Sequence, residues 1–67
     1  MGSNKKLGKN IKKAREEANL TQEQAAVKAG IHVNYFARVE RGEQTPSVEV
    51  LEEIAKAVKV RAADLLA

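Results

Sequence analysis

Three polar side chains, those of Asn34, Arg38 and Arg41, recur at intervals of four and three residues. In a helix this spacing places them on one face. An asparagine amide can pair bidentately with adenine, and a guanidinium group can pair bidentately with guanine. Ala37 lies beside them and is small enough to let a helix backbone approach the floor of a groove. These residues predict a helix that reads base pairs, and an ordinary solvated helix face is the alternative.

Side chains around that face could contact a phosphate strand. Gln22 stands at the start of a preceding short helix, where backbone N–H groups and the helix dipole favour an anion. Lys28 belongs to the same short helix and could also approach a phosphate. Tyr35 suits a packing position, with its hydroxyl group reaching solvent or a phosphate. We therefore expect phosphate contacts from Gln22, Lys28 and Tyr35.

His32 and Val33 come directly before Asn34 and leave several roles open. His32 could cap the helix, contact DNA or do neither, and the weak capping propensity of histidine favours a position near DNA. Val33 could touch a thymine methyl group or pack against the preceding helix. Both residues join Asn34 and Arg38 as candidates for base contacts.

Glu40 lies in the stretch YFARVERG, on the helix side that Phe36 and Val39 mark as buried. A buried carboxylate without a partner is costly, so it should be paired or protonated. Arg15 is the best partner, because it lies on the flank of the apolar stripe of the first helix. We therefore predict a structural ion pair between Arg15 and Glu40. A catalytic role for Glu40 is the alternative, but no second catalytic group accompanies it.

Turn signals divide the chain into five short helical segments, and the first runs from about Lys5 to Ala18. Asn4 is its expected N-cap, and Asn19 suits the left-handed conformation at its end. The apolar residues of this segment form one narrow stripe at helical spacing: Leu7, Ile11, Ala14 and Ala18. We expect residues 1–4 to be a disordered N-terminus or a tag remnant, ahead of a single domain in residues 5–67.

The second and third segments predict a helix-turn-helix unit, with AGIH as its turn. Thr21 caps the second segment in a weak capping box, and Gly30 ends it. The third segment begins near His32 or Val33 and ends at Gly42. Five short helices joined by brief loops predict a compact all-α domain.

The last two segments are expected to complete the core. Thr45 or Ser47 caps the fourth helix, with Pro46 at its entry or first position. Its apolar stripe consists of Val48, Leu51, Ile54, Ala55 and Val58. The fifth segment runs from about Ala62 to Leu66. Three apolar residues are least needed by the core and could form a dimer contact, or simply pack the fifth helix on the fourth: Val50, Leu65 and Leu66.

The composition argues against several kinds of site. The 67 residues contain no cysteine and one histidine. Disulfides, thiolate metal sites and a histidine-based metal or hydrolytic site are therefore not expected. The sequence also offers no nucleophile–base pair and no phosphate-binding loop, so we expect neither an enzyme nor a cofactor. No run approaches the length of a membrane-spanning helix and no signal peptide is visible, which favours a cytoplasmic protein.

The charge is unevenly distributed along the chain. Residues 1–41 carry nine Lys or Arg against four Glu, while residues 42–67 carry three Lys or Arg against five acidic residues. This asymmetry indicates that the first two-thirds of the chain face something anionic. A solvated lysine face is the alternative reading of the charge taken alone.

The stretch TQEQAAVKAGIHVNYFARVERGEQTPSVEVLEEIAKAVKV resembles the helix-turn-helix of Cro and phage-repressor type regulators, also called the Xre family. The most specific parts are TQEQAA with AGI, then RVERGEQTPS, then IAKAVKV, and the resemblance covers about residues 7–66. It implies a five-helix domain that binds operator DNA, usually as a homodimer on a two-fold site. Two positions depart from the pattern: Ala25 where leucine is usual, and Phe36 where isoleucine is common. We expect the larger Phe36 to fill the volume that Ala25 leaves.

The resemblance also implies roles for individual positions. Gln22 matches a glutamine that contacts phosphate in relatives. Arg41 and the backbone after Gly42 lie where relatives meet the sugar-phosphate strand. Arg15 and Glu40 occupy the positions of a structural ion pair. The positions at which relatives read bases are His32, Val33, Asn34 and Arg38.

The predicted function is a sequence-specific transcriptional regulator of prokaryotic or phage type, cytoplasmic and associated with the nucleoid. It would place its third helix in the major groove of double-stranded DNA. The alternative is a protein-interaction module of antitoxin or coactivator type. Restriction-modification controllers, phage repressors and antitoxins share this pattern, which does not separate repressors from activators.

Overall fold

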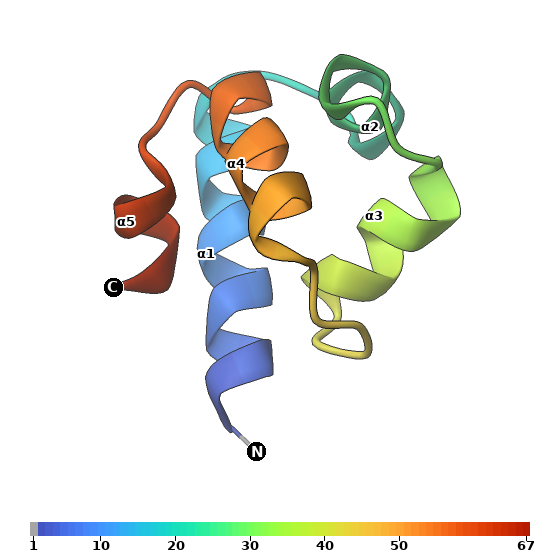
Figure 1. Ribbon diagram of the computed structural model, residues 1–67. Helices are drawn as coiled ribbons and strands as arrows, with labels where there is room; N and C mark the ends of the chain where they lie inside the picture. The colour runs from blue at the N-terminus through green and yellow to red at the C-terminus, as the bar shows by residue number, and fades with distance from the viewer. Residues whose placement is uncertain (1) are drawn as a thin grey trace.

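The computed structural model describes the backbone of residues 2–67 and the side chains of residues 4–67. Within this part the chain forms five helices and no strand, which confirms the predicted all-α fold (Figure 1). The helices are α1 (Gly2–Glu17), α2 (Gln22–Ala29), α3 (Val33–Glu40), α4 (Val48–Ala57) and α5 (Ala62–Leu66).

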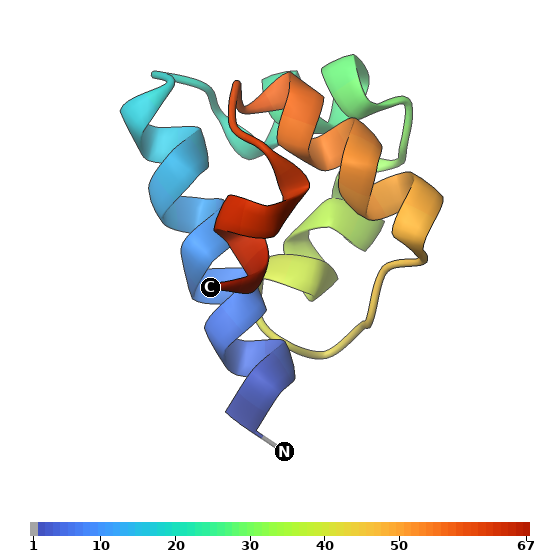
Figure 2. The same ribbon diagram turned by 60° about the vertical axis from the view of Figure 1, so that its left-hand side comes forward.

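The longest helix, α1, lies between α5 and α3 in the view of Figure 1. It packs against both of them, and α4 packs against α2 and α5 (Figures 1 and 2). The two helices α2 and α3 contact each other and form the predicted helix-turn-helix pair. As a result, α3 is held from behind by α1 and α2, and its opposite face remains open.

One apolar core lies among the five helices. Phe36, Ile11 and Ile54 are fully buried at its centre. Ala25 and Phe36 belong to the same cluster and both have zero exposure, and the expected volume compensation between them stays a prediction. Val48 was expected on the buried stripe of α4, but its side chain is 71% exposed. This expectation was wrong because Val48 is the first residue of α4, where the helix enters from the loop at the edge of the core.

Each of the first four helices ends in the same backbone arrangement. A residue with positive φ follows the helix, and the N–H of the next residue donates to the carbonyl five residues earlier. This is the Schellman motif, which satisfies carbonyls at a helix end. The positive-φ residues are Asn19, Gly30, Gly42 and Lys59. The residues that follow them and donate the bond are Leu20, Ile31, Glu43 and Val60.

The helix starts confirm some expected caps and correct one. Thr21 and Gln24 form a reciprocal capping box at α2. Ser47, rather than Thr45, caps α4 through a bond from the Val50 N–H, and Pro46 precedes this cap. Asn4 is not an N-cap, because α1 begins at Gly2 and Asn4 lies inside its first turn. Met1 lies outside the described residues, and the disorder expected for residues 1–4 stays a prediction.

A close approach between α1 and the end of α3 depends on Gly8. A Cβ atom at this position would collide with the carbonyl oxygen of Glu40 and lie 2.7 Å from that of Val39. These are backbone atoms that cannot rotate away. Glycine therefore allows α1 to lie directly against the last turn of α3.

Candidate nucleic-acid interface

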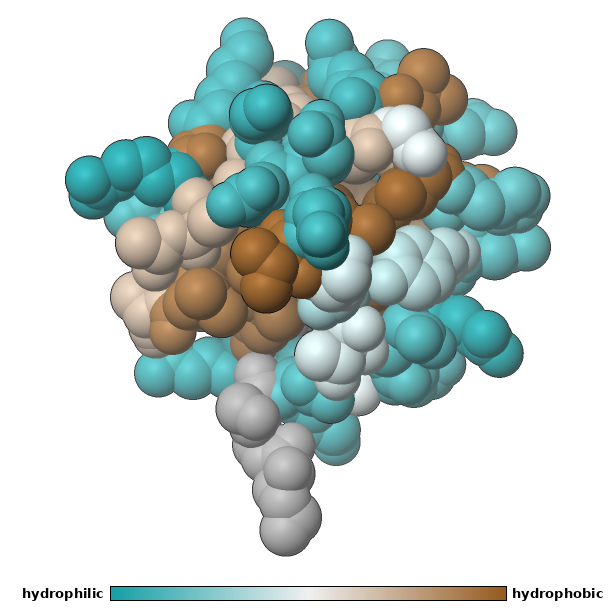
Figure 3. All heavy atoms as spheres, in the orientation of Figure 1, coloured by the Kyte–Doolittle hydropathy of each residue, from teal (hydrophilic) through white to brown (hydrophobic). Residues whose placement is uncertain are grey.

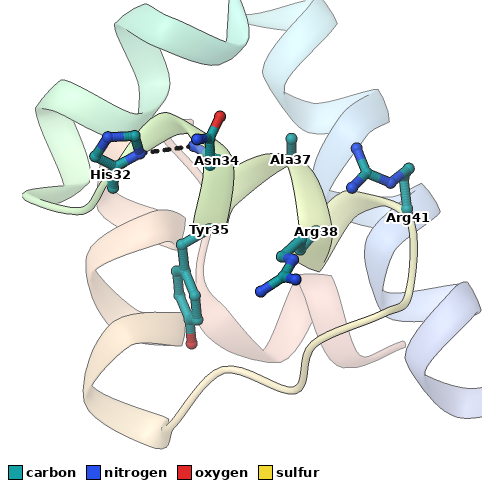
Figure 4. Close-up of a pocket in the computed structure, with 6 residues that line it drawn as sticks. All are labelled: His32, Asn34, Tyr35, Ala37, Arg38 and Arg41. Carbon is teal, nitrogen blue, oxygen red and sulfur yellow. Dashed lines mark hydrogen bonds between the residues drawn. The ribbon is translucent and has the colours of Figure 1, made fainter.

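The open face of α3 forms a shallow concave surface (Figure 4). Asn34, Ala37 and Arg38 project from the helix itself, and Asn34 and Arg38 are exposed. The full lining consists of His32, Asn34, Tyr35, Ala37, Arg38 and Arg41. The structure thus brings together most of the side chains that the sequence assigned to DNA. The combination of an amide and two guanidinium groups around a small alanine suits hydrogen bonding to base edges.

His32 is the N-cap of α3. Its Nδ1 accepts a hydrogen bond from the Asn34 N–H at 3.0 Å (Figure 4). Capping by histidine was expected to be poor, so the structure corrects this point. An imidazole that accepts at Nδ1 carries its proton on Nε2. His32 therefore stabilises the start of α3 and retains one N–H donor for a ligand on the concave surface.

Arg41 forms a forked ion pair with Glu43 rather than standing free. Its Nε lies 2.9 Å from Oε2, and its Nη2 lies 3.1 Å from Oε1. The side-chain hydrogen bond from Arg41 lowers the pKa of Glu43, and the charge of Arg38 lowers it further. The same hydrogen bond raises the pKa of Arg41. Both side chains are more than half exposed, so the guanidinium group remains accessible to another anion.

The remaining candidates divide between two environments. Tyr35 is half-buried, packs against the core and lines the concave surface. Val33 is half-buried against the core and does not line that surface, in agreement with its packing alternative. Lys28 is exposed on α2, beside Glu23 and Val27 on a separate shallow surface. The structure therefore does not bring Lys28 and Val33 together with Asn34 and Arg38.

A buried network behind α3 contains the predicted ion pair. Arg15 donates from Nε to Glu40 Oε2 at 2.6 Å and from Nη2 to Oε1 at 3.2 Å. The side-chain hydrogen bond to Glu40 raises the pKa of Arg15, although burial opposes this shift. Arg15 Nη1 also donates to the Leu20 carbonyl at 2.8 Å. One guanidinium group thus ties α1, the loop before α2 and the end of α3.

Gln22 is the third side chain of this network. Its Nε2 donates to Glu40 Oε1 at 2.9 Å, a contact that the sequence did not predict. A primary amide has two N–H groups, so one remains for another acceptor. The backbone N–H groups of Gln22 and Glu23 lie in the first turn of α2, where a helix offers them no carbonyl partner. The Thr21 hydroxyl group accepts only from the Gln24 N–H, so these two donors stay free. The start of α2 therefore offers three N–H donors that Glu40 helps to position.

Sequence reasoning missed Gly8 and Glu43. A glycine inside a helical stripe lowers helix stability, so its presence at Gly8 was a signal of close packing. Glu43 was expected only as a residue of the loop EQTPS, with no partner assigned to it. The turn signal of Gly42 could have placed it three residues after the end of α3, but its pairing with Arg41 depends on side-chain geometry.

A second surface is apolar and lies between α1, the loop before α4, and α5. Leu7, Pro46 and Leu51 line this groove together with the fifth helix. Val48 and Leu66 are exposed at 71% and 64%. Figure 3 shows brown atoms over α4 and α5 on this side of the molecule.

The three candidates for a dimer contact differ in how deeply they are buried. Leu66 is exposed, Val50 is half-buried against the core, and Leu65 is only 2% exposed. Leu65 therefore packs α5 on the core, and the assignment of its side chain to a partner surface is not supported. Asn10 Nδ2 also donates to the Leu65 carbonyl at 2.9 Å, which fixes α5 beside α1.

The described part of the chain carries neither of two further structural features. None of its helices has both the length and the apolar character needed to cross a membrane. The same residues contain no group of three or more His, Cys, Asp or Glu side chains that could hold a metal ion.

Comparison with known proteins relates both the sequence and the fold to regulators. Residues 11–65 match the helix-turn-helix family. The chain is 42% identical over 55 residues to an HTH-type transcriptional regulator of Mycobacterium tuberculosis, covering 82% of this chain and 39% of that protein. It is 40% identical over 55 residues to the immunity repressor of Bacillus phage phi105, covering 82% of this chain and 38% of the repressor. The chain thus spans about two-fifths of the length of these relatives.

The fold resembles that of solved regulators over nearly its whole length. The restriction-modification controller protein C.AhdI from Aeromonas hydrophila superposes with a TM-score of 0.93 at 26% sequence identity. The match covers 97% of this chain and 98% of the controller protein. The similarity therefore includes all five helices and not only the helix-turn-helix pair.

Proposed function

Because the chain belongs to the helix-turn-helix family of Cro and phage-repressor type regulators, we propose that it is a sequence-specific transcriptional regulator that binds operator DNA. In this proposal α3 enters the major groove and the protein performs no chemistry. The observation that supports it best is the open face of α3, which presents Asn34 and Arg38 around Ala37. Binding to bacterial or phage operators places the protein in the cytoplasm with the nucleoid.

Asn34 and Arg38 are the proposed base-reading residues. Asn34 pairs with the N6 and N7 groups of adenine, and Arg38 pairs with O6 and N7 of guanine. His32 adds its Nε2–H donor beside them, at a base edge or a phosphate. Val33 packs against the core, so its contribution to reading is limited to an apolar contact at the edge of the helix.

The proposed phosphate contacts flank α3 on both sides. At the start of α2, the free amide N–H of Gln22 and two backbone N–H groups bind one phosphate. Beyond the end of α3, Arg41 binds another, and the hydroxyl group of Tyr35 reaches the same strand. Lys28 contributes long-range attraction from the adjacent surface of α2 rather than a direct contact.

We propose that two copies of the chain bind one operator as a homodimer. The groove between α1 and α5, with the exposed side chains of Val48 and Leu66, is the apolar surface that a second copy covers. Val50 contributes at its edge. Sedimentation at high micromolar concentration tests this directly: a dimer that Leu66→Glu converts to a monomer supports the proposal. If the wild-type chain is monomeric both alone and on its DNA site, the dimer is excluded.

Selection of bound sequences from a random duplex pool is the most informative test of the function. The expected result is a two-fold site whose half-sites are about 10 base pairs apart, one helical turn. Binding to a random-sequence duplex at two salt concentrations should also show a strong salt dependence. Absence of any salt-dependent binding would reject the DNA-binding function and favour a protein-interaction module.

A further inference from the structure

Glu43 differs from the residues at the corresponding positions of the other helix ends. In the Schellman motif, the residue after the positive-φ position commonly makes an apolar contact with its own helix. Leu20, Ile31 and Val60 occupy this position after α1, α2 and α4, and all three pack against the core. After α3 the position is held by Glu43, which is exposed. The end of α3 therefore replaces an apolar anchor with a carboxylate.

The backbone of this motif fixes where the carboxylate lies. The Glu43 N–H donates to the Arg38 carbonyl at 2.9 Å, and Gly42 adopts φ +78° between them. This turn brings Glu43 back towards the last turn of α3. Its two oxygens then accept from Nε and Nη2 of Arg41. The hydrogen bond from Arg41 is the main cause that lowers the pKa of Glu43, and the charges of Arg41 and then Arg38 lower it further, so the carboxylate is ionised beside two arginines of the concave surface.

This pair contributes little to holding the fold together. Its side chains are 56% and 53% exposed, and ion pairs between exposed side chains contribute little to stability. Arg41 binds Glu43 through its Nε and Nη2 donors. A guanidinium group binds a phosphate through the same forked pair of donors. A DNA phosphate and the Glu43 carboxylate therefore compete for the same donors.

We propose that Glu43 is an intramolecular competitor for the phosphate site of Arg41, and that it weakens binding to every DNA sequence. This inference rests on the proposed function, and it adds Glu43 as a residue that sets the affinity for DNA. A complex that depends only on phosphate contacts loses part of its binding energy to this competition. A complex on the operator loses the same amount but adds its base contacts from α3, so the competition sets the overall affinity and leaves the ratio of the two affinities unchanged.

The test compares Glu43→Gln with the matched control Glu17→Gln. Both variants remove one negative charge from an exposed side chain, but Glu17 lines a surface between α1 and α5, away from α3. Binding of each purified full chain to a short duplex of random sequence is measured over a range of salt concentrations. Glu43→Gln is expected to raise the affinity about fivefold at low salt and to steepen the plot of log K against log salt by about 0.9. Glu17→Gln is expected to change both quantities much less.

The same substitution in an Arg41→Gln background tests whether the effect passes through Arg41. There Glu43→Gln should behave like Glu17→Gln. Equal effects of Glu43→Gln and Glu17→Gln in the otherwise wild-type chain would show a general charge effect and overturn the inference. A loss of affinity in Glu43→Gln would also overturn it, because Glu43 would then position Arg41 productively. If the wild-type chain binds no duplex at any salt concentration, the proposed function itself fails.

Discussion

Arg15 and Glu40 connect α1 to the last turn of α3 through a buried ion pair, with Nε and Oε2 2.6 Å apart. Glu40 also accepts from Gln22, so one carboxylate holds the first residue of α2. No buried side-chain nitrogen or oxygen in the described part of the chain lacks a hydrogen-bond partner. The pair is therefore a positioning element, which sets α3 relative to the donors at the start of α2.

Replacing Glu40 with glutamine should destabilise the domain strongly. Arg15 is only 9% exposed, and the variant leaves its charge buried without a counter-charge. Breaking one partner of such a pair costs about 3–5 kcal/mol. Urea denaturation followed by circular dichroism measures the loss. Lys56→Gln, which breaks an exposed pair with Glu53, is the control and should change stability by less than about 1 kcal/mol. Equal effects of the two substitutions would contradict the structural role of Glu40.

Substitution of Gly8 by alanine should destabilise the domain, although alanine is the better helix former. The new methyl group meets the carbonyl oxygens of Val39 and Glu40, so α1 must move away from α3. We expect a loss of about 1–3 kcal/mol, as for an overpacked core, in thermal or urea unfolding. Gly30→Ala is the comparison, because no atom lies within 4 Å of its added Cβ and only its φ of +74° opposes the change. A stabilised Gly8→Ala variant would show that this close approach is absent.

Two substitutions of His32 should separate helix capping from DNA binding. His32→Ala removes the acceptor for the Asn34 N–H and should cost about 1 kcal/mol of stability. His32→Asn restores a good cap and should keep or raise stability. Both variants lack the Nε2–H donor, so both should bind the selected operator more weakly. Full operator affinity in His32→Asn would limit the residue to its capping role.

Arg38→Ala and Arg41→Ala should weaken DNA binding in different ways. Arg38→Ala should cost about 1–3 kcal/mol on the selected operator and relax the preference at one base pair. Arg41→Ala should weaken binding to all sequences alike, but the full reduction of the salt slope by about 1 is expected only in a Glu43→Gln background, because Glu43 holds the guanidinium group of Arg41 in the wild type. Fluorescence anisotropy on the operator and on single-base variants distinguishes them. A loss of the same size on every sequence for Arg38→Ala would instead make Arg38 a phosphate contact.

The start of α5 should respond to pH through Asp64. Its carboxylate accepts from the Arg61 backbone N–H, and this hydrogen bond is the main cause of its lowered pKa. A folded-state pKa below the unfolded value stabilises the fold above the unfolded pKa. This contribution is lost as the pH falls through the folded-state value. The stability difference between the wild type and Asp64→Ala should therefore be largest near neutral pH and shrink in acid, as urea unfolding across pH can measure. A difference independent of pH would contradict the assignment.

Much of the fold could be predicted from local signals. Thr21 with Gln24 marked the start of α2, and Gly30 and Gly42 marked the ends of α2 and α3. The spacing of Phe36 and Val39 defined the inner side of α3 and so placed Glu40 there. These features depend on helical periodicity and on the conformational freedom of glycine, both of which act over a few residues.

Other features depended on contacts between distant segments. Gln22 was predicted to contact phosphate, but only the packing of α2 against α3 brings its amide to Glu40. Val48 fits the helical stripe, yet its place at the entry of α4 leaves it exposed. Leu65 and Leu66 are equally apolar neighbours, and only the position of α5 beside α1 decides which is buried.

The sequence by itself determined the five helices and the side of α3 that faces outward, because both follow from residue types at short spacing. It also indicated Arg15 as the charge partner of Glu40, 25 residues away, through the position of Arg15 on the flank of the first helix and through the family resemblance. The tertiary structure decided which contacts the outward side chains of α3 make. A Schellman turn after α3 places the carboxylate of Glu43 on Arg41, and the glycine at position 8 brings α1 against the carbonyls of the same helix end. Such contacts depend on the relative placement of whole helices, which only the packing of the complete core fixes.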